Sequence, residues 1–296
     1  MRQALKALLP YGLRNRLRSL RFYDRLQSRH LALTSKRIDL CAAQFAHVLS
    51  LANHPPLKGK VCLELGCGWV LSHALVCYLL GAEKVIATDI VGQAFPRSLG
   101  LAVRNAIPSI PQDILSPFEE HAQLRDRFER LLAVPRFDLT TLHDLGIEYV
   151  SPIDFSRQTL PERVDFIYSI SVLEHVPCPD VVPMLRNLVS MLSDGGTMIH
   201  CFHLEDHKDL AKHPFDFLSI PAEQFPPAAQ SERGNRLRHS VWSETFDDLP
   251  SSTTSFLYSW SRDDKPLPTV IDSSIKHVDE ADLRVSHLGA YTRKCV

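Results

Sequence analysis

The hydrophobic and polar positions between residues 58 and 203 alternate between two kinds of segment. Short, largely apolar runs, which are typical of buried parallel strands, occupy residues 61–65, 84–89, 146–153, 164–169 and 197–202. Segments of helical character, at residues 70–80 and 183–192, follow the first and the fourth of these runs. Strands that alternate with helices predict a parallel sheet with right-handed crossover connections.

Two further runs, at residues 256–260 and 283–293, predict strands that complete a seven-stranded sheet. Residues 94–145 are rich in proline and charge, and residues 204–250 are polar, rich in histidine and interrupted by prolines, so we interpret both as insertions over the ligand face. The predicted fold class is therefore α/β, a doubly wound, Rossmann-like and mostly parallel seven-stranded sheet with helical insertions.

The N-terminal residues form a separate, basic part of the pattern. Leu13, Leu17 and Leu20 recur at helical spacing between arginines, which predicts a basic amphipathic helix over residues 13–29, and residues 36–54 predict a second helix that ends at His54-Pro55-Pro56. The predicted organisation is a basic N-terminal helical segment at residues 1–57 and one domain at residues 58–296.

Charge is distributed unevenly although the formal net charge is only −1. Residues 1–37 hold ten lysines and arginines and one acid, Asp24, so this segment carries +9 and the remainder about −10. The basic helix could contact an anionic membrane surface or an anionic substrate, or its arginines could be solvated or paired with the acidic body. We keep peripheral membrane contact as a hypothesis and expect no nucleic-acid partner.

Composition and cysteine usage narrow the setting. A chain with 45% hydrophobic and 23% charged residues, and with no apolar run of about 18 residues, predicts a soluble protein. Pro10, Gly12 and the arginines that follow replace the apolar segment and cleavage site of a signal peptide, so we expect no export. Seven cysteines without a C-x-x-C pair favour free thiols and a cytoplasmic location.

The residues that follow the first two strands point to an adenosine-containing cofactor. In doubly wound sheets, ligands bind beyond the carboxyl ends of the strands. Gly66 and Gly68 allow a sharp turn there, and Asp89, at the end of the second strand, can accept hydrogen bonds from both hydroxyls of a ribose. A dinucleotide site would need a third glycine where Leu71 stands, which argues against a pyrophosphate turn.

The segment from Val61 to Gly68 resembles motif I of class I S-adenosylmethionine (SAM)-dependent methyltransferases, an acid followed by G-x-G. Four downstream segments resemble later elements of the same family: residues 153–155 (Ile-Asp-Phe), 164–169, 171–176 (Ser-Val-Leu-Glu-His-Val) and 192–197. Of these, residues 171–176 resemble the small-molecule methyltransferases of the ubiquinone-biosynthesis type. The resemblance covers about residues 58–203 and implies a SAM cofactor held by Glu64, Gly66, Gly68, Asp89, Asp154, Phe155 and Ser169.

In this resemblance Glu64 organises the loop near the amino group of the cofactor, and Asp154 and Phe155 flank adenine. Val70 departs from the family pattern, which often has a third glycine there, so the approach to the methionine end would be tighter. Taken one by one, Glu64 could instead be a helix-dipole partner, and Asp89 and Asp154 could be turn residues.

A histidine-rich segment follows the fifth strand. His203 and His207, spaced for one helix face, could join Asp206 as zinc or iron ligands, but we expect no metal and favour proton acceptance. The candidate catalytic residues are His207, with Asp206 beside it, and His175.

The acceptor side is predicted from charge. Arg236 and Arg238 could hold an anionic acceptor, with His203 facing it, or could pair with Glu244 and Asp247. The predicted function is transfer of a methyl group from SAM to oxygen or nitrogen of a small-molecule or glycan-like acceptor. The alternatives are a non-catalytic SAM-binding or scaffold protein, and a metal-dependent enzyme that uses the His200 to His207 cluster.

Overall fold

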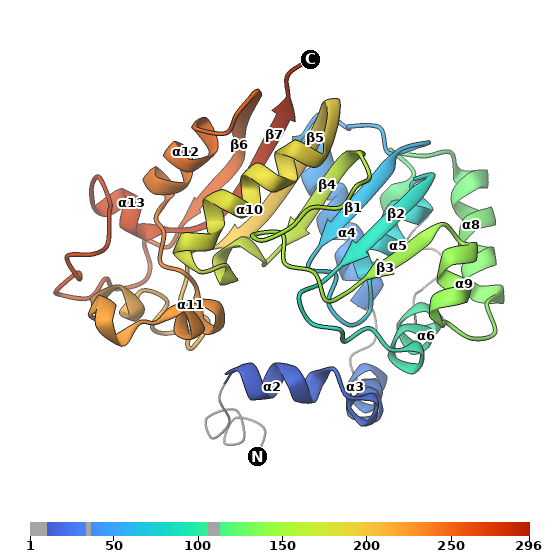
Figure 1. The fold of residues 1–296 in the computed structure, drawn as a ribbon, viewed down its shortest axis with the longest axis horizontal. Coiled ribbons are helices and arrows are strands. Elements are labelled where there is room, and N and C mark those ends of the chain that lie inside the picture. The colour runs from blue at the N-terminus through green and yellow to red at the C-terminus, as the bar shows by residue number, and fades with distance from the viewer. Residues whose placement is uncertain (1–10, 34–36, 106–112) are drawn as a thin grey trace. The chain divides into compact units, whose positions relative to one another are not determined.

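The computed structural model describes residues 11–33, 37–105 and 113–296, and these form one seven-stranded sheet of order β3-β2-β1-β4-β5-β7-β6 (Figure 1). The strands are β1 (Val61–Leu65), β2 (Lys84–Thr88), β3 (Ile147–Val150), β4 (Val164–Ile170), β5 (Leu192–His203), β6 (Ser252–Ser261) and β7 (Val285–Lys294). β2 runs parallel to β1 and β3, whereas β7 is antiparallel to β5 and β6. The order reverses beside β1, as in doubly wound folds, which confirms the predicted fold class.

The chain separates into two compact units, and the predicted division after residue 57 stays a prediction. Unit 1 holds the described residues up to Asp154 and residues Val164–Ile167, and unit 2 holds Phe155–Arg163 and Tyr168–Val296. Helix α4 (Arg37–Leu51) falls in unit 1 because it packs on α5 (Ser72–Leu79) through buried apolar side chains.

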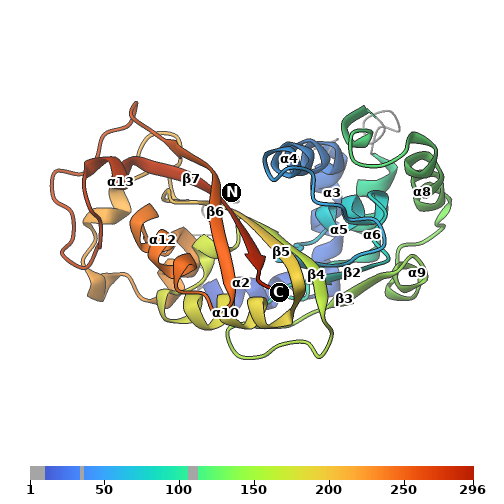
Figure 2. The same ribbon diagram turned by 90° about the horizontal axis from the view of Figure 1, so that it is seen from above.

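Unit 1 gathers α3, α4, α5 and α6 on one side of its strands (Figure 2). Its helices are α2 (Tyr11–Arg18), α3 (Arg21–Leu33), α4, α5, α6 (Pro96–Arg104), α8 (His121–Ala133) and α9 (Leu139–Asp144). Four of the five residues of β1, and four of those of β2, are buried, as expected of parallel strands covered on both faces. Every residue of α5 is buried, so this helix forms the centre of the core of unit 1.

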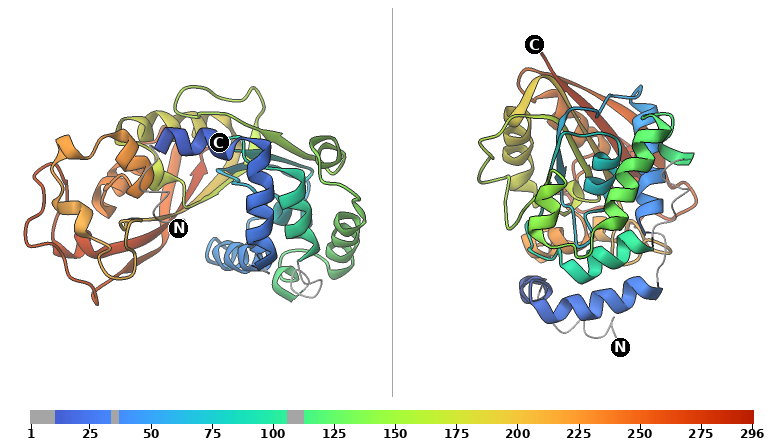
Figure 3. Two further views of the ribbon diagram at one scale, coloured as in Figure 1. Left: turned by 90° about the horizontal axis from the view of Figure 1, so that it is seen from below. Right: turned by 90° about the vertical axis from the view of Figure 1, so that its right-hand side faces the viewer.

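The basic helix predicted over residues 13–29 is in fact two helices, α2 and α3, which meet at a bend at Ser19-Leu20 (Figure 3). The hydroxyl of Ser19 donates to the carbonyl of Arg16, a local bond that competes with continuation of the helix. The carboxylate of Asp24 accepts hydrogen bonds from the amide and hydroxyl of Ser98, in the first turn of α6. One acid thereby ties the basic segment to unit 1.

Unit 2 contains α10 (Cys178–Met191), α11 (Pro227–Arg233), α12 (His239–Asp247), α13 (Glu280–Arg284) and three 3-10 turns, η1 (Leu173–His175), η2 (Asp216–Ser219) and η3 (Ala222–Gln224). A cluster of buried apolar side chains, among them Phe215, Phe217 and Phe225, fills the predicted insertion at residues 204–250. Among the described helices, none combines the length and apolar content that crossing a membrane requires.

Candidate functional site

The turn after β1 is built from two glycines with left-handed backbone. Gly66 and Gly68 have φ angles of 75° and 64°, which other residues adopt only at a cost in free energy. The amides of Gly66 and Cys67 both donate to the carbonyl of Thr88, so the turn is fixed to the end of β2. A Cβ atom added to Gly68 would have no neighbouring atom within 4 Å, which leaves its backbone accessible to a ligand.

Asp89 lies beside this turn and is only 7% exposed. Its Oδ2 accepts the amide of Gly68 at 2.9 Å, and its Oδ1 accepts the amide of Val91 at 2.8 Å. Burial raises the pKa of Asp89, although the hydrogen bonds from Val91 and Gly68 oppose this shift. Oδ2 also accepts a long hydrogen bond, 3.5 Å, from Nε2 of Gln93. Since a carboxylate has about four acceptor positions, the two oxygens can receive a pair of ligand hydroxyls once this Gln93 side chain moves aside.

Glu64, 3% exposed, uses its carboxylate inside unit 1. Oε2 accepts the amide of Ala74 in the first turn of α5 at 2.8 Å, and Oε1 lies 3.1 Å from Nδ1 of His73. Burial lowers the pKa of His73, but hydrogen bonds with Cys41 and Glu64 outweigh burial and raise it to about 9. A phosphate at this helix terminus would meet a carboxylate already bound there, which is a second argument against a dinucleotide.

Leu71, at the start of α5, has left-handed backbone, with φ 50° and ψ 40°. Val70, the residue that differs from the family pattern, is not the one in this conformation. A leucine in this region costs roughly 1–2 kcal/mol relative to a glycine. Both side chains are buried, so the extra bulk of Val70 lies within the protein and not in the space beside Gly68.

The remaining predicted cofactor residues are divided between the units. Asp154 is half-buried in unit 1, where the amide of Ile153 donates to the carbonyl of Asp89 and so holds this segment at the end of β2. In unit 2, Phe155 is buried, and the hydroxyl of Ser169 forms a 2.7 Å hydrogen bond with Nδ1 of His200. Their roles toward adenine and cofactor stay predictions.

Unit 2 brings together four side chains that we call the Glu174 cluster: Glu174, His175, His203 and His207. Oε1 of Glu174 accepts the amide of His203 at 3.3 Å and lies 3.8 Å from Nε2 of His207. The rings of His175 and His207 meet edge to face with centroids 4.5 Å apart. The structure therefore places the two predicted proton acceptors, His175 and His207, side by side.

Burial sets the charge of this cluster. It raises the pKa of Glu174 to about 7, although the nearby His203 lowers it. Burial, together with His175 and His203, lowers the pKa of His207 to about 4, and burial lowers that of His175. Both imidazoles are consequently neutral near pH 7 and have a lone pair available.

Asp206 does not assist His207 as predicted. The guanidinium of Arg233 binds both carboxylate oxygens of Asp206, one of them through Nε at 3.0 Å. Residues 204–214 form turns, so His203 and His207 do not share a helix face. Because the carboxylate is already paired, the alternative metal set of His203, Asp206 and His207 is not formed.

Arg236 and Arg238 have structural surroundings that argue against acceptor binding. The side chain of Arg238 is fully buried, and its guanidinium donates to the carbonyls of Leu204, Leu283 and Val285. Arg236 donates to the carbonyls of Phe217 and Ile220 and stacks on the ring of Phe225. Neither pairs with Glu244 or Asp247 in these bonds, and both are largely buried, whereas a substrate anchor needs an accessible guanidinium.

Two contributors to the cluster were not predicted from the sequence. Glu174 is part of the quoted 171–176 segment, where an acid inside an apolar run is a signal that could have been used. Asn235 holds η1 in place, since its amide donates to the carbonyl of Glu174 at 2.7 Å and its side chain donates to those of Leu173 and Val176. No comparable sequence signal marks Asn235.

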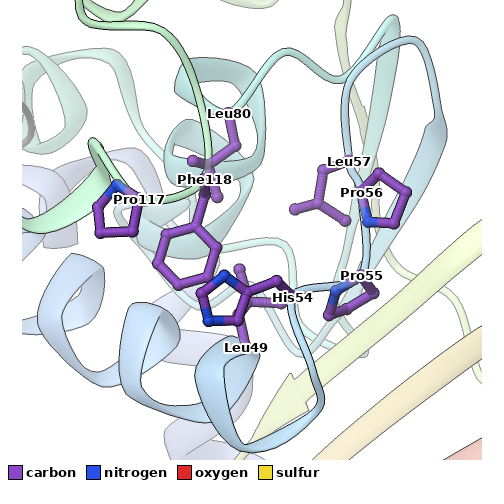
Figure 4. Close-up of a pocket in the computed structure, with 8 residues that line it drawn as sticks. All are labelled: Leu49, His54, Pro55, Pro56, Leu57, Leu80, Pro117 and Phe118. Carbon is purple, nitrogen blue, oxygen red and sulfur yellow. The ribbon is translucent and has the colours of Figure 1, made fainter.

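A separate hollow in unit 1 is lined by residues that are mostly apolar (Figure 4). The ring of His54 packs against that of Phe118 there, with centroids 4.7 Å apart. The other lining residues are Leu49, Pro55, Pro56, Leu57, Leu80 and Pro117. None of the predicted site residues lines this hollow, so we do not assign the function to it.

No protein-family model matches the chain, and no curated protein matches it. Among solved structures, it is similar to an S-adenosylmethionine-dependent methyltransferase from Mesorhizobium loti, with 17% identity, a TM-score of 0.47 and coverage of 85% of this chain and 98% of that one. It is also similar to the N-methyltransferase NodS from Bradyrhizobium japonicum, with 13% identity, a TM-score of 0.42 and coverage of 88% of this chain and 97% of that one. A third similar structure is the magnesium protoporphyrin IX methyltransferase ChlM from Synechocystis, with 13% identity, a TM-score of 0.43 and coverage of 85% of this chain and 82% of that one. Similarity of this degree does not decide the function, which is argued from the site itself.

Proposed function

We propose that the chain is a SAM-dependent methyltransferase that acts on oxygen or nitrogen of a small-molecule or glycan-like acceptor. The observation that carries the proposal is Asp89, which lies beside the accessible backbone of Gly68 and whose two buried oxygens each hold one loop amide. The only further bond to this carboxylate among the described residues is a long one, 3.5 Å, from the side chain of Gln93, which a ribose hydroxyl can replace. A buried carboxylate at the end of the second strand of a doubly wound sheet is suited to the two hydroxyls of a ribose.

The residues of unit 1 fit the cofactor in chemistry as well as in position. Asp89 would hold the ribose hydroxyls, and the backbone of Gly66 and Gly68 would lie against the cofactor. Glu64 keeps the turn in shape through Ala74 and His73, and Asp154 would contact adenine as the sequence resemblance implies. When bound, SAM supplies a methyl group on a positively charged sulfur, which is the electrophile of the reaction.

The residues assigned to the acceptor lie in unit 2. Methyl transfer forms a bond from the acceptor oxygen or nitrogen to the methyl carbon while the carbon–sulfur bond breaks, and the acceptor loses a proton. The neutral imidazole of His207 or His175 can take that proton, because their lowered pKa values keep them unprotonated near pH 7.

Aromatic rings near His203 support a glycan-like acceptor or another acceptor with an apolar ring face. His287 packs edge to face on His203 with centroids 4.2 Å apart, and its other contacts are stacked rings of Tyr258 and Trp260. Trp260 is about half exposed, so its ring is accessible to solvent. Apolar ring faces with a few polar groups are typical of small-molecule sites.

Calorimetric titration of the full chain with S-adenosylhomocysteine tests the cofactor assignment. We expect one binding site per chain, followed by release of methyl groups from SAM when a suitable acceptor is supplied. Binding without any turnover would favour the scaffold alternative. An intact, folded chain that does not bind S-adenosylhomocysteine would contradict the proposal.

The setting of the enzyme is also proposed. All seven cysteines are free, and five of them are buried, which supports a reducing, cytoplasmic environment. Helix α3 and the bend before it expose Leu20, Phe22 and Leu26 beside Arg21 and Arg25, with Phe22 exposed to 55%. Apolar side chains among arginines are suited to the surface of an anionic membrane.

Vesicle sedimentation tests this membrane contact. We expect the full chain to bind vesicles that contain phosphatidylserine, to release at high salt, and to bind pure phosphatidylcholine weakly. Replacing Leu20, Phe22 and Leu26 by serine should weaken binding at least about tenfold, because each inserted side chain contributes about 1.5–3 kcal/mol. Leu210→Ser, which changes an exposed leucine of unit 2, is the control. Equal binding by the triple variant would exclude this surface.

A further inference from the structure

We infer that Glu174, His175 and His207 bind one divalent first-row transition-metal ion within unit 2. One ligand atom from each of these residues lies within 4.8 Å of the other two. Two imidazoles and one carboxylate are a donor set that suits zinc, iron, cobalt or manganese, and three protein ligands leave further coordination positions open.

The first support is that buried polar atoms in this cluster lack partners. Oε2 of Glu174 and Nε2 of His207 are both buried, and no residue in the described part of the chain forms a hydrogen bond of ordinary geometry with them. Glu174 itself is only 1% exposed. Unpaired buried atoms cost free energy, so one carboxylate oxygen and one imidazole nitrogen without a partner indicate an occupant that binds both.

The second support is the orientation of His175. Its Nδ1 lies 2.9 Å from the carbonyl of Ser231, and because a carbonyl only accepts, Nδ1 carries the proton. The lone pair of the neutral ring is then on Nε2. A histidine that binds a metal commonly donates its other N–H to a carbonyl in this way, which fixes the tautomer and the ring.

The third support is that the chain holds the three residues from several directions. The amide of His207 donates to the carbonyl of Arg233, and that of Asn235 donates to the carbonyl of Glu174, so η1 and the loop after β5 are both joined to the end of α11. The ion pair of Asp206 with Arg233 reinforces the same loop. Positions fixed by tertiary contacts favour a preformed site.

The three ligand atoms, which lie within 4.8 Å of one another, must move closer together to bind a metal. With bonds of about 2.1 Å, tetrahedral ligand atoms are about 3.4 Å apart, and His207 Nε2 is 3.8 Å from Glu174 Oε1. A bound divalent ion would leave a net charge of +1 with the carboxylate. With the ion bound, the imidazoles of His175 and His207 are ligands and do not take the proton of the acceptor. An open position would instead bind an oxygen of the methyl acceptor and lower its pKa, a role that rests on the proposed function.

Titration of the full chain with Co²⁺ tests the site directly. With protein purified without a polyhistidine tag, and in the absence of SAM and acceptor, we expect one Co²⁺ per chain by dialysis and metal analysis, with a visible absorption band. His207→Ala and Glu174→Gln should each weaken binding at least about tenfold. His213→Ala is the matched control, since it removes an exposed histidine paired with Asp216 outside the cluster.

Thermal unfolding provides a second measurement that does not depend on activity. Co²⁺ should raise the melting temperature of the wild type and of His213→Ala, but not that of His207→Ala, because only a chain that binds the ion gains stability from it. A wild type that takes up no stoichiometric Co²⁺, or Co²⁺ binding unchanged in both cluster variants, would overturn the inference. Binding of S-adenosylhomocysteine in metal-free buffer is measured separately, so failure of one proposal does not imply failure of the other.

Discussion

Asp89→Asn is expected to weaken binding of S-adenosylhomocysteine to the full chain by about 100-fold. The carboxylate holds the amides of Gly68 and Val91 and, in the proposed function, also receives two ribose hydroxyls. Asparagine keeps the shape but replaces one acceptor oxygen by a donor, which sets an N–H against a group that must donate. Hydrogen bonds to a charged group contribute about 1.5–3 kcal/mol, and about 2.8 kcal/mol corresponds to 100-fold. Calorimetry measures the change.

The control for this variant is Asp144→Asn, which makes the same charge change at an exposed position of unit 1. It should leave the dissociation constant unchanged. The melting temperature of Asp89→Asn shows whether the loop has lost its structure as well as its ligand. Wild-type affinity in a folded Asp89→Asn chain would remove Asp89 from the cofactor site.

Raising the pH from about 6.5 to 9 is expected to remove stability that depends on the Glu64–His73 pair. The pKa of His73 is about 9 in the folded chain, against about 6.5 for an unperturbed histidine. Protonation therefore stabilises the fold fully below pH 6.5, and this stability is lost as the pH rises through 9. A shift of this size corresponds to about 3 kcal/mol in the free energy of unfolding.

Urea unfolding of Glu64→Gln should measure the contribution of Glu64 to the pH-dependent free energy of unfolding. At pH 6 we expect the free energy of unfolding to fall by less than about 3 kcal/mol, because the buried imidazolium loses its carboxylate but keeps its hydrogen bond with Cys41. We expect the difference from wild type to narrow by pH 9.5. Glu129→Gln, at an exposed site on α8, is the control for loss of one negative charge. A wild type and a Glu64→Gln variant that differ equally at both pH values would contradict the assignment.

The Glu64–His73 pair also supports the turn of Gly66 and Gly68. Glu64 holds the first turn of α5 through Ala74, and α5 begins directly after the glycine turn and the strained Leu71. Loss of Glu64 should therefore also weaken S-adenosylhomocysteine binding, although the carboxylate need not contact the ligand. The resemblance assigned Glu64 to the organisation of this loop, and the contacts agree with that part of the prediction.

Much of unit 1 follows from local sequence. The apolar runs at residues 61–65 and 84–89 are close to β1 and β2, because a strand buried on both faces needs a continuous apolar stretch. Gly66, Gly68 and Asp89 are recognisable because the turn requires left-handed backbone and the adjacent amides require an acceptor. These features depend on residues that are close together in the sequence, so the sequence alone predicts them.

The partners of the charged residues in unit 2 are known only from the tertiary structure. The sequence places Asp206 beside His207 and offers Arg238 as an anchor, but folding pairs Asp206 with Arg233 and surrounds Arg238 with three carbonyls. It also brings Glu174 to His207, which is far from it in the sequence. The turn of Gly66 and Gly68 was thus determined by the sequence alone. The Glu174 cluster was not, because the partners of a buried charge depend on which distant segments of the chain meet around it.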